Sequence, residues 1–277
     1  MVDDVTVCIP TYKRPESLSM VLSRLLASTD RIVEILIGIT GEEEDSLGRM
    51  REQIEQICKA FEIEGINVMV RTDLSGLMEA KQWFIDYATT EILLFLDDDA
   101  ILGKDYLDLV DNFANDEVGA VSGVLQTPRN GAGYADWSDV PISVDDRYSN
   151  SLIYDRRRKT LQWIDKYQVY MHEENKIFDC EYLIGTALLV RKDLVEIDME
   201  FQNGACGGEE IDFTYSIYQQ GYKLWFDSSR VCWHLHENKG GMREKDRAKD
   251  QENFDYLVKK WGLGNGVEDR CTHYIKE

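Results

Sequence analysis

The sequence lacks the segments that would place a protein in a membrane or send it out of the cell. No apolar run approaches the roughly 20 residues that a transmembrane helix needs. The first residues, Met1-Val2-Asp3-Asp4, have neither the basic nor the apolar part of a signal peptide. We therefore expect a soluble, intracellular protein in the cytoplasm, without a transmembrane segment.

Positive charge is scarce as well. The chain has 31 lysines and arginines against 52 aspartates and glutamates, which gives a net charge of −21. Such a molecule repels nucleic acids and anionic membrane surfaces, so neither is an expected partner. An anionic ligand would need local cations or a metal ion to overcome this field.

Cysteine is sparse and scattered. The six cysteines include no CxxC pair, and Cys8 and Cys232 lie inside apolar runs that are typical of strands. This pattern favours buried, reduced thiols over disulfides or a zinc site.

The first hundred residues alternate apolar runs with helical patterns, which is typical of βαβ units and a parallel sheet. The chain is 277 residues long and 43% hydrophobic, so it can bury a large core. We expect an α/β fold. The predicted strands are Val5–Ile9, Glu34–Ile39, Ile66–Arg71 and Ile92–Leu96. Three helices are predicted in this part of the chain. The first begins at Pro15, the second carries Leu47, Met50, Ile54, Ile57 and Phe61 on one face, and the third covers about Leu77–Ala88.

The pattern weakens between residues 124 and 178, where Arg156-Arg157-Arg158-Lys159 form a basic cluster. This cluster could clamp a phosphate, but a solvated hairpin or strand edge is favoured. Order returns with the apolar run Tyr182–Val190 and a helix that ends at Gln220 before Gly221. A strand pair around residues 224–226 and 231–233 follows. The tail holds an amphipathic helix with Phe254, Leu257, Val258 and Trp261 on one face.

Three consecutive aspartates, Asp97, Asp98 and Asp99, follow the predicted strand Ile92–Leu96. In an open α/β sheet the ligand crevice lies outside the carboxyl ends of the strands. Carboxylates at this position can hold a divalent cation, which can in turn hold a diphosphate. Taken alone, the pattern equally allows a strand that simply reaches solvent through its aspartates.

Four motifs occur in a fixed order along the chain. They are Val7-Cys8-Ile9-Pro10-Thr11-Tyr12-Lys13-Arg14, Asp97-Asp98-Asp99, Gly207-Gly208-Glu209-Glu210-Ile211-Asp212-Phe213 and Trp233-His234-Leu235-His236. Their order and spacing resemble family 2 glycosyltransferases, over about residues 2–100 and 180–237. The resemblance implies a GT-A fold, which is a Rossmann-like mixed central sheet with flanking helices. It also implies a metal-dependent, inverting transfer of a sugar from a nucleotide-diphosphate sugar to a hydroxyl acceptor, such as a glycan, a lipid-linked glycan or a small molecule.

The loop after the first strand matches the nucleotide-binding loop of the family. Tyr12 would offer a face for the base, and Arg14 a charge for phosphate. The aspartate triplet resembles the DXD element, in which the first or middle aspartate meets the ribose and the last meets the metal, so Asp99 is the expected metal ligand. Without the other motifs, the loop could be an ordinary connection between a strand and a helix. The resemblance assigns donor binding to Pro10, Thr11, Tyr12, Arg14, Thr40, Lys81, Asp97 and Asp98.

Two histidines, His234 and His236, alternate in a β-like run and therefore project to the same side. One neutral imidazole can complete a Mn²⁺ or Mg²⁺ shell of carboxylate, phosphate and water oxygens, and it favours manganese. His234 falls where the family places its metal histidine. The alternative is a pair of surface histidines on an edge strand.

Glu209, Glu210 and Asp212 open a predicted helix, where acids are also favoured simply by the helix dipole. An inverting transfer needs a base that takes the proton of the acceptor hydroxyl. The family usually has Glu-Asp here, with the second residue as the base. We therefore expect Glu210 to be the base, with Asp212 in reserve and Glu209 in an orienting role.

The sequence departs from the family at the end of the second strand. The family usually has an aspartate there that reads uracil, whereas this chain has Ile39-Thr40-Gly41-Glu42. A uridine donor is therefore in doubt, and base recognition falls to Glu34, Thr40 or the backbone. Lys81 stands where arginine is typical and keeps the charge without the bidentate fork.

The expected organisation is one catalytic domain with a helical tail. Residues 1–240 would form the GT-A domain, with a nucleotide-binding half (1–100) and an acceptor-binding half (101–240), and residues 241–277 a helical tail packed on it. Two other functions stay open. A sugar-nucleotide nucleotidyltransferase would need glycines that the first loop lacks, and a non-catalytic protein could bind a sugar nucleotide or glycan on the same scaffold.

Overall fold

The computed structural model describes residues 4–25, 30–41, 45–60, 65–126, 150–155, 160–165, 177–183, 185–201, 208–235 and 247–262. The strands are β1 (Val5–Thr11), β2 (Ile32–Thr40), β3 (Asn67–Leu74), β4 (Ile92–Leu96), β5 (Ala100–Leu102), β6 (Val118–Gln126), β7 (Asn150–Asp155), β8 (Thr160–Asp165), β9 (Ile177–Cys180), β10 (Ala187–Arg191) and β11 (Lys223–His234). The helices are α1 (Pro15–Leu25), α2 (Asp45–Ala60), α3 (Leu77–Tyr87), α5 (Glu209–Gln219) and α6 (Arg247–Trp261), with short 3-10 helices η2 (Tyr106–Ala114) and η3 (Lys192–Leu194).

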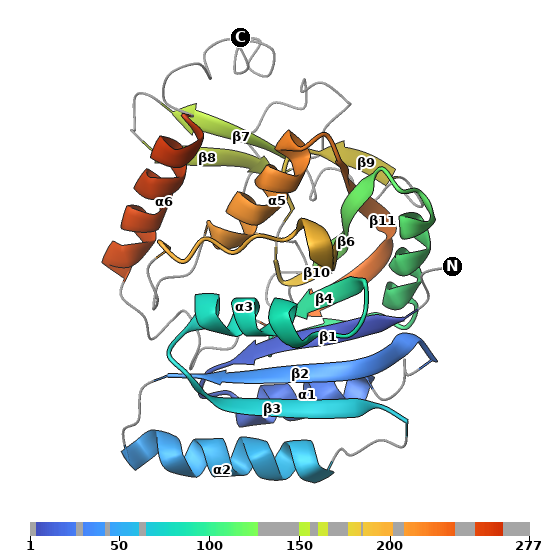
Figure 1. Cartoon of the computed structure of the whole chain (residues 1–277), viewed down its shortest axis with the longest axis vertical. Coiled ribbons are helices and arrows are strands. Elements are labelled where there is room, and N and C mark those ends of the chain that lie inside the picture. Colours follow the sequence, from blue (N-terminus) through green and yellow to red (C-terminus); the bar gives the residue numbers. More distant parts are fainter. Residues whose placement is uncertain are drawn as a thin grey trace.

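A nine-stranded mixed sheet forms the centre of the molecule (Figure 1). The strand order is β3-β2-β1-β4-β10-β6-β11-β5, with β9 paired to β11 beside this path. The strands β3, β2, β1 and β4 are parallel, so their carboxyl ends share one edge. Beyond β4 the strand β10 runs antiparallel and begins beside the carboxyl end of β4. The expected α/β fold is confirmed. The strand β4 spans the predicted residues, and β1, β2 and β3 extend beyond their predicted carboxyl ends.

Helices cover both faces of the sheet because successive strand residues point to opposite sides. On one face, Cys8 and Phe95 of the sheet share a core with residues of α3, α5 and α6. On the other face, Val7 and Leu94 pack with residues of α1, α2 and η2. The strands β1, β2 and β4 are therefore buried on both sides, which explains their continuous apolar runs, whereas the edge strand β3 is mostly half-exposed.

The predicted strand pair after residue 223 is wrong, because β11 is one continuous strand. Its pairing with β6 shifts between Asp227 and Val231, where residues 228–230 form a bulge. Gly123 of β6 makes room for this bulge, since a Cβ atom there would lie 2.6 Å from the Arg230 carbonyl oxygen. The polar residues 228–230 resemble a turn in the sequence, but in the structure they form a bulge within the continuous strand β11.

The second half of the apolar run Tyr182–Val190 belongs to β10. Residues 182–183 and 185–186 precede that strand and are called its lead-in here. The Leu183 amide donates a hydrogen bond to Thr214 Oγ1 of α5 over 3.2 Å. The lead-in therefore fastens α5 to the sheet.

Four of the six cysteines are buried free thiols, as expected: Cys8, Cys58, Cys180 and Cys232. Among the described residues, no helix combines the length and the apolar character needed to cross a membrane. Several residues named in the sequence predictions lie outside the described parts of the chain. They are Glu42, Phe61, Arg156-Arg157-Arg158-Lys159, Cys206, Gly207, His236, Cys271 and the side chains of Leu47 and Phe254.

The C-terminal helix α6 packs on the same core as α5. Leu257 is fully buried in that core. Lys260 Nζ lies 2.6 Å from Asp198 Oδ2, and the Tyr256 hydroxyl donates to the same oxygen over 2.7 Å. Helix α6 therefore packs on the main domain, while the predicted domain bounds stay a prediction.

We expect Leu257→Ala to lower the free energy of unfolding by about 2–5 kcal/mol, because the substitution leaves a cavity in the core. Urea unfolding followed by tryptophan fluorescence measures this change. Lys259→Ala, at an exposed position of the same helix, is the matched control and should stay within about 0.5 kcal/mol of wild type. An unchanged midpoint for Leu257→Ala would show that α6 does not belong to the cooperative core.

Candidate active site

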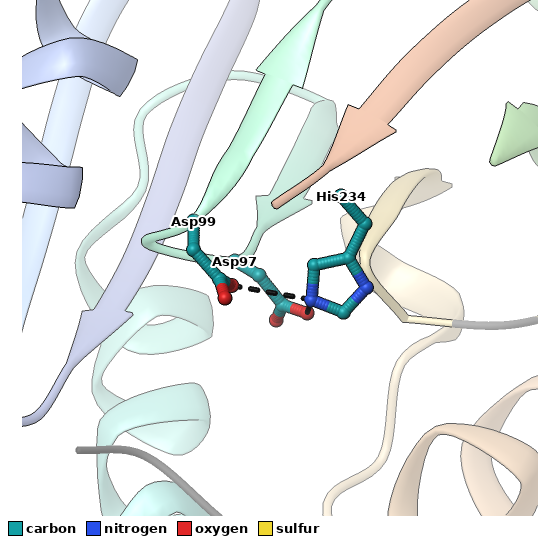
Figure 2. Close-up of side chains that lie close together, drawn as sticks. All are labelled: Asp97, Asp99 and His234. Atoms are coloured by element: carbon teal, nitrogen blue, oxygen red, sulfur yellow. Dashed lines mark hydrogen bonds and ion pairs between the residues drawn. The ribbon is translucent and has the colours of Figure 1, made fainter. Parts of the chain in front are cut away.

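The aspartate triplet follows β4, and two of its members, Asp97 and Asp99, meet His234 at the end of β11 (Figure 2). His234 Nε2 lies 3.2 Å from Asp99 Oδ1 and 3.8 Å from Asp97 Oδ2. One ligand atom from each of these three residues lies within 4.8 Å of the others. Two carboxylate oxygens and one imidazole nitrogen suit Mn²⁺ or Mg²⁺, and the imidazole favours manganese. Asp97, Asp99 and His234 therefore fit a divalent metal site.

Backbone pairing fixes this arrangement. β11 runs antiparallel to β5 with His234 opposite Ala100, and the Leu235 amide donates to the Asp99 carbonyl oxygen over 2.9 Å. On the other side, the Asp97 amide donates to the Thr186 carbonyl oxygen over 2.9 Å. The turn after β4 is thus held by β11 and by the lead-in to β10.

The triplet concentrates negative charge in a site where the side chains of Asp98 and Asp99 are buried and that of Asp97 is 40% exposed. Burial raises the pKa of Asp97 to about 7; the charge of His234 opposes this shift and those of Asp99 and Asp98 add to it. Burial also raises the pKa of Asp98 to about 6, although Arg14 opposes the shift. Burial alone would lower the pKa of His234, but its hydrogen bond to Asp99 and the charge of Asp97 raise it. A cation bound here would relieve the repulsion among the carboxylates.

The loop after β1 is tied to the triplet through Asp98. The Thr11 hydroxyl donates to Asp98 Oδ2 over 2.7 Å, and the Tyr12 amide approaches the same oxygen at 3.4 Å. Arg14 Nη1 lies 2.9 Å from Asp98 Oδ1 and 3.1 Å from Asp99 Oδ2. The structure therefore brings Thr11, Tyr12 and Arg14 to the triplet. It also shows that Asp98, expected at the ribose, holds this loop.

Pro10 and Thr40 lie at neighbouring strand ends. Pro10 pairs with Gly38 in the β1–β2 ladder, and Thr40 Oγ1 donates to the Thr11 carbonyl oxygen over 3.4 Å. Both residues border the carboxyl edge of the sheet. Their expected contacts with the donor stay a prediction.

Glu34 does not qualify as a base-reading residue, because it lies near the other end of β2. Its carboxylate accepts hydrogen bonds from Thr6 Oγ1 over 2.9 Å, Asn67 Nδ2 over 3.1 Å and the Thr89 amide over 3.0 Å. In the ladder Glu34 pairs with Thr6, five residues before Thr11, which is roughly 16 Å of strand. Glu34 thus joins strands and a loop within the fold.

Helix α5 begins with an ion pair between Glu209 and Lys81 of α3. Lys81 Nζ lies 3.0 Å from Glu209 Oε1, both side chains are buried, and the ammonium lies 5.4 Å from the centre of the Phe213 ring. Burial alone would raise the pKa of Glu209, but Lys81 outweighs it and holds that pKa below its ordinary value. The expected contact of Lys81 with donor phosphate stays a prediction.

Glu210 is half-buried in the first turn of α5. Burial raises the pKa of Glu210 well above its ordinary value, and the charge of Glu209 adds to the shift. Its Oε2 atom finds no hydrogen-bond partner within the described part of the chain. Gly185 packs against this side chain, since a Cβ atom on Gly185 would lie 3.0 Å from Glu210 Cβ. An oxygen in this state suits a group that accepts a proton.

Asp212 points away from Glu210 and towards α6. Trp261 Nε1 donates to Asp212 Oδ1 over 2.7 Å, and Lys260 Nζ donates to Oδ2 over 2.8 Å. Burial raises the pKa of Asp212, although both hydrogen bonds oppose the shift. Because α6 engages both oxygens, Asp212 serves the packing of the two helices.

The sequence predictions missed three residues near the site: Gly185, Lys260 and Trp261. A glycine just before an apolar strand signals a close backbone approach, but the approaching residue cannot be read from the sequence. Lys260 and Trp261 lie about fifty residues after α5 begins, and neither belongs to a recognisable motif. Their hydrogen bonds with Asp212 can be recognised only in the folded chain.

We expect Lys81→Met to lower the free energy of unfolding by about 3–5 kcal/mol at pH 7, because it leaves the buried Glu209 carboxylate unpaired. The double variant Lys81→Met with Glu209→Gln should recover most of this loss. Urea unfolding measures both. The exposed pair Lys223–Glu117, with Nζ and Oε2 2.6 Å apart, gives the control Lys223→Met, which should cost at most about 1 kcal/mol. Equal losses in the two single variants would contradict a buried electrostatic role for Lys81.

A comparison with the curated proteins finds no significant match to this sequence. Among solved structures, the chain is similar to one described as "Crystal structure of GalNAc-T7 with UDP, GalNAc and Mn2+", with a TM-score of 0.65 and 14% sequence identity. The match covers 99% of this chain but 58% of that chain, so this chain spans little more than half its length. This likeness confirms the expected GT-A fold. Residues 6–193 match the family described as Glycosyl transferase family 2, and the chain belongs to that family.

Proposed function

We propose that the protein is a metal-dependent, inverting glycosyltransferase that moves a sugar from a nucleotide-diphosphate sugar to a hydroxyl group of a glycan, a lipid-linked glycan or a small molecule. One observation carries the proposal: Asp97, Asp99 and His234 converge at the carboxyl end of β4, the edge of the sheet where ligands bind in such folds. Family membership supports glycosyl transfer. The cytoplasmic location expected from the sequence stays a prediction.

The proposed base lies beside the proposed metal site. Gly185 packs against Glu210, and the next residue, Thr186, accepts a hydrogen bond from the Asp97 amide. Two consecutive residues therefore connect the start of α5 to the triplet. This connection supports a reaction centre between Glu210 and the metal ligands.

In the proposed mechanism, Glu210 Oε2 takes the proton of the acceptor hydroxyl while the acceptor oxygen attacks the anomeric carbon. The bond between that carbon and the diphosphate oxygen breaks on the opposite side, and the configuration inverts. A divalent cation held by Asp97, Asp99 and His234 would stabilise the negative charge of the leaving diphosphate. Thr11 and Tyr12 shape the loop that would hold the nucleotide, because both are anchored to Asp98.

Two observations bear on which nucleotide base the donor carries. The similar solved structure contains UDP, which makes a uridine donor the first candidate. Thr40, in place of the usual aspartate, argues for a more tolerant base site with Tyr12 as a stacking surface. A panel of uridine, guanosine, cytidine and thymidine diphosphates therefore belongs in every binding experiment.

We expect nucleoside diphosphate binding to need Mn²⁺ and to need Asp99. Calorimetry should show a loss of affinity on the order of 10- to 100-fold after chelation or in Asp99→Asn, because Asp97, Asp99 and His234 would hold the cation that offsets the charge of the diphosphate. Asp111→Asn removes an exposed carboxylate from η2 and serves as the control. Wild-type affinity in Asp99→Asn, or in the chelated protein, would contradict the proposed metal site.

We expect Glu210→Gln to lower the transfer rate on the order of 10²–10⁴-fold with little change in donor affinity, because the proton acceptor is lost while the shape is kept. Asp212→Asn should retain most of the rate, since α6 occupies that carboxylate. The base acts when deprotonated, so the wild-type rate should rise with pH along a limb above the ordinary pKa of glutamate, and Glu210→Gln should lack that limb. Loss of transfer in Asp212→Asn, with retention in Glu210→Gln, would move the base role to Asp212.

A further inference from the structure

Arg14 bridges two neighbouring aspartates of the triplet from the start of α1. Its Nη1 atom lies 2.9 Å from Asp98 Oδ1 and 3.1 Å from Asp99 Oδ2. The side chains of Arg14, Asp98 and Asp99 are 11%, 6% and 1% exposed, so this contact is shielded from solvent. Arginine keeps its charge at every physiological pH, and Arg14 therefore places a permanent positive charge inside the acidic cluster.

Asp99 divides its two oxygens between different partners. Oδ2 faces Arg14 at 3.1 Å, and Oδ1 faces His234 Nε2 at 3.2 Å. A cation shared by Asp99 and His234 would therefore meet Oδ1, while Oδ2 stays with the guanidinium. One carboxylate then separates two positive groups, and repulsion between them is strong because little water screens it.

We propose that Arg14 is an internal counter-cation that couples metal binding to donor binding: it weakens binding of the divalent cation alone and favours binding when a diphosphate is present. This inference rests on the metal site of the proposed function. The diphosphate of the donor brings several negative charges next to both cations, so repulsion between Arg14 and the metal becomes attraction of both to the diphosphate. The metal and the nucleotide should then each raise the affinity for the other by the same factor.

The contacts of Asp98 support this role over that of an ordinary phosphate-binding arginine. Asp98 Oδ2 is held by the Thr11 hydroxyl at 2.7 Å and by the Tyr12 amide at 3.4 Å, and its other oxygen holds Arg14. Arg14 is thus anchored within the metal-ligand cluster by the loop that would cradle the nucleotide. An arginine that only bound phosphate would not require the contact of Arg14 with the metal ligand Asp99.

The test measures Mn²⁺ binding in solution, by the electron paramagnetic resonance signal of free Mn²⁺, without nucleotide and with a saturating nucleoside diphosphate from the panel. In Arg14→Gln, Mn²⁺ alone should bind roughly tenfold tighter than in wild type, because one nearby positive charge is gone. The factor by which nucleotide improves Mn²⁺ affinity should fall by a similar amount. Arg14→Lys keeps the charge and should stay close to wild type in both measurements.

Controls separate charge from geometry and from folding. Arg31→Gln removes the same charge from a distant pair with Asp111 and should leave Mn²⁺ binding unchanged. A thermal melt monitors the fold of each variant. If Arg14→Gln does not fold, Arg14→Lys decides: wild-type Mn²⁺ affinity and coupling support the charge role, and a loss of either overturns it.

The failures are distinguishable. If wild type binds no Mn²⁺ even with nucleotide, or if Asp99→Asn binds it as wild type does, the metal site of the proposed function falls, and this inference falls with it. If Asp99→Asn loses Mn²⁺ but Arg14→Gln binds Mn²⁺ alone with unchanged or weaker affinity, only the counter-cation role is overturned. Unchanged Mn²⁺ affinity with weaker nucleotide binding would make Arg14 a plain diphosphate contact, and weaker Mn²⁺ affinity would make it a residue that orients Asp99.

Discussion

Negative charge at the end of β4 is the constraint on which the rest of the site depends. The side chains of Asp98 and Asp99 are 6% and 1% exposed, and that of the adjoining Asp97 is 40% exposed. Repulsion among carboxylates grows as water is removed, so the groups that offset it must come from elsewhere in the fold. Arg14 comes from the loop after β1 and His234 from β11, more than two hundred residues apart in the chain. The mixed sheet makes this possible, because β5 turns back after the triplet and pairs with the end of β11.

A second charged centre lies where α3 meets α5. Glu209 and Glu210 are adjacent, but Lys81 holds the pKa of Glu209 low, while burial and the charge of Glu209 raise the pKa of Glu210. Neighbouring acids with oppositely shifted pKa values are a common arrangement where one acid stays charged and the other exchanges a proton. Lys81 causes this difference between the two pKa values, because its ammonium pairs with Glu209. Its position in α3, which packs on the sheet, connects the proposed base to the parallel strands.

The parallel half of the fold was predictable because its strands β1, β2 and β4 are buried on both faces and therefore show as continuous apolar runs. Asp99 and His234, which lie at strand ends, were also expected to meet, whereas the hydrogen bond of Thr11 with Asp98 was not predicted. The bulge of β11 was not predictable, because it depends on Gly123 in a different strand. The prediction that Glu34 could recognise the base was wrong for a similar reason. Its position near the start of β2 does not reveal that Thr6 and Thr89 donate hydrogen bonds to it.

The acidic motif at the start of α5 divides its work between two faces of the helix. Residues two positions apart on an α-helix point about 200° apart, so Glu210 and Asp212 face opposite sides. Glu210 lies against Gly185 near the triplet, while Asp212 holds Lys260 and Trp261 of α6. The contacts that fasten α6 to the domain therefore also fix the rotation of α5 about its axis. Because that rotation determines where the Glu210 carboxylate points, helix α6 positions the proposed base through its contacts with Asp212.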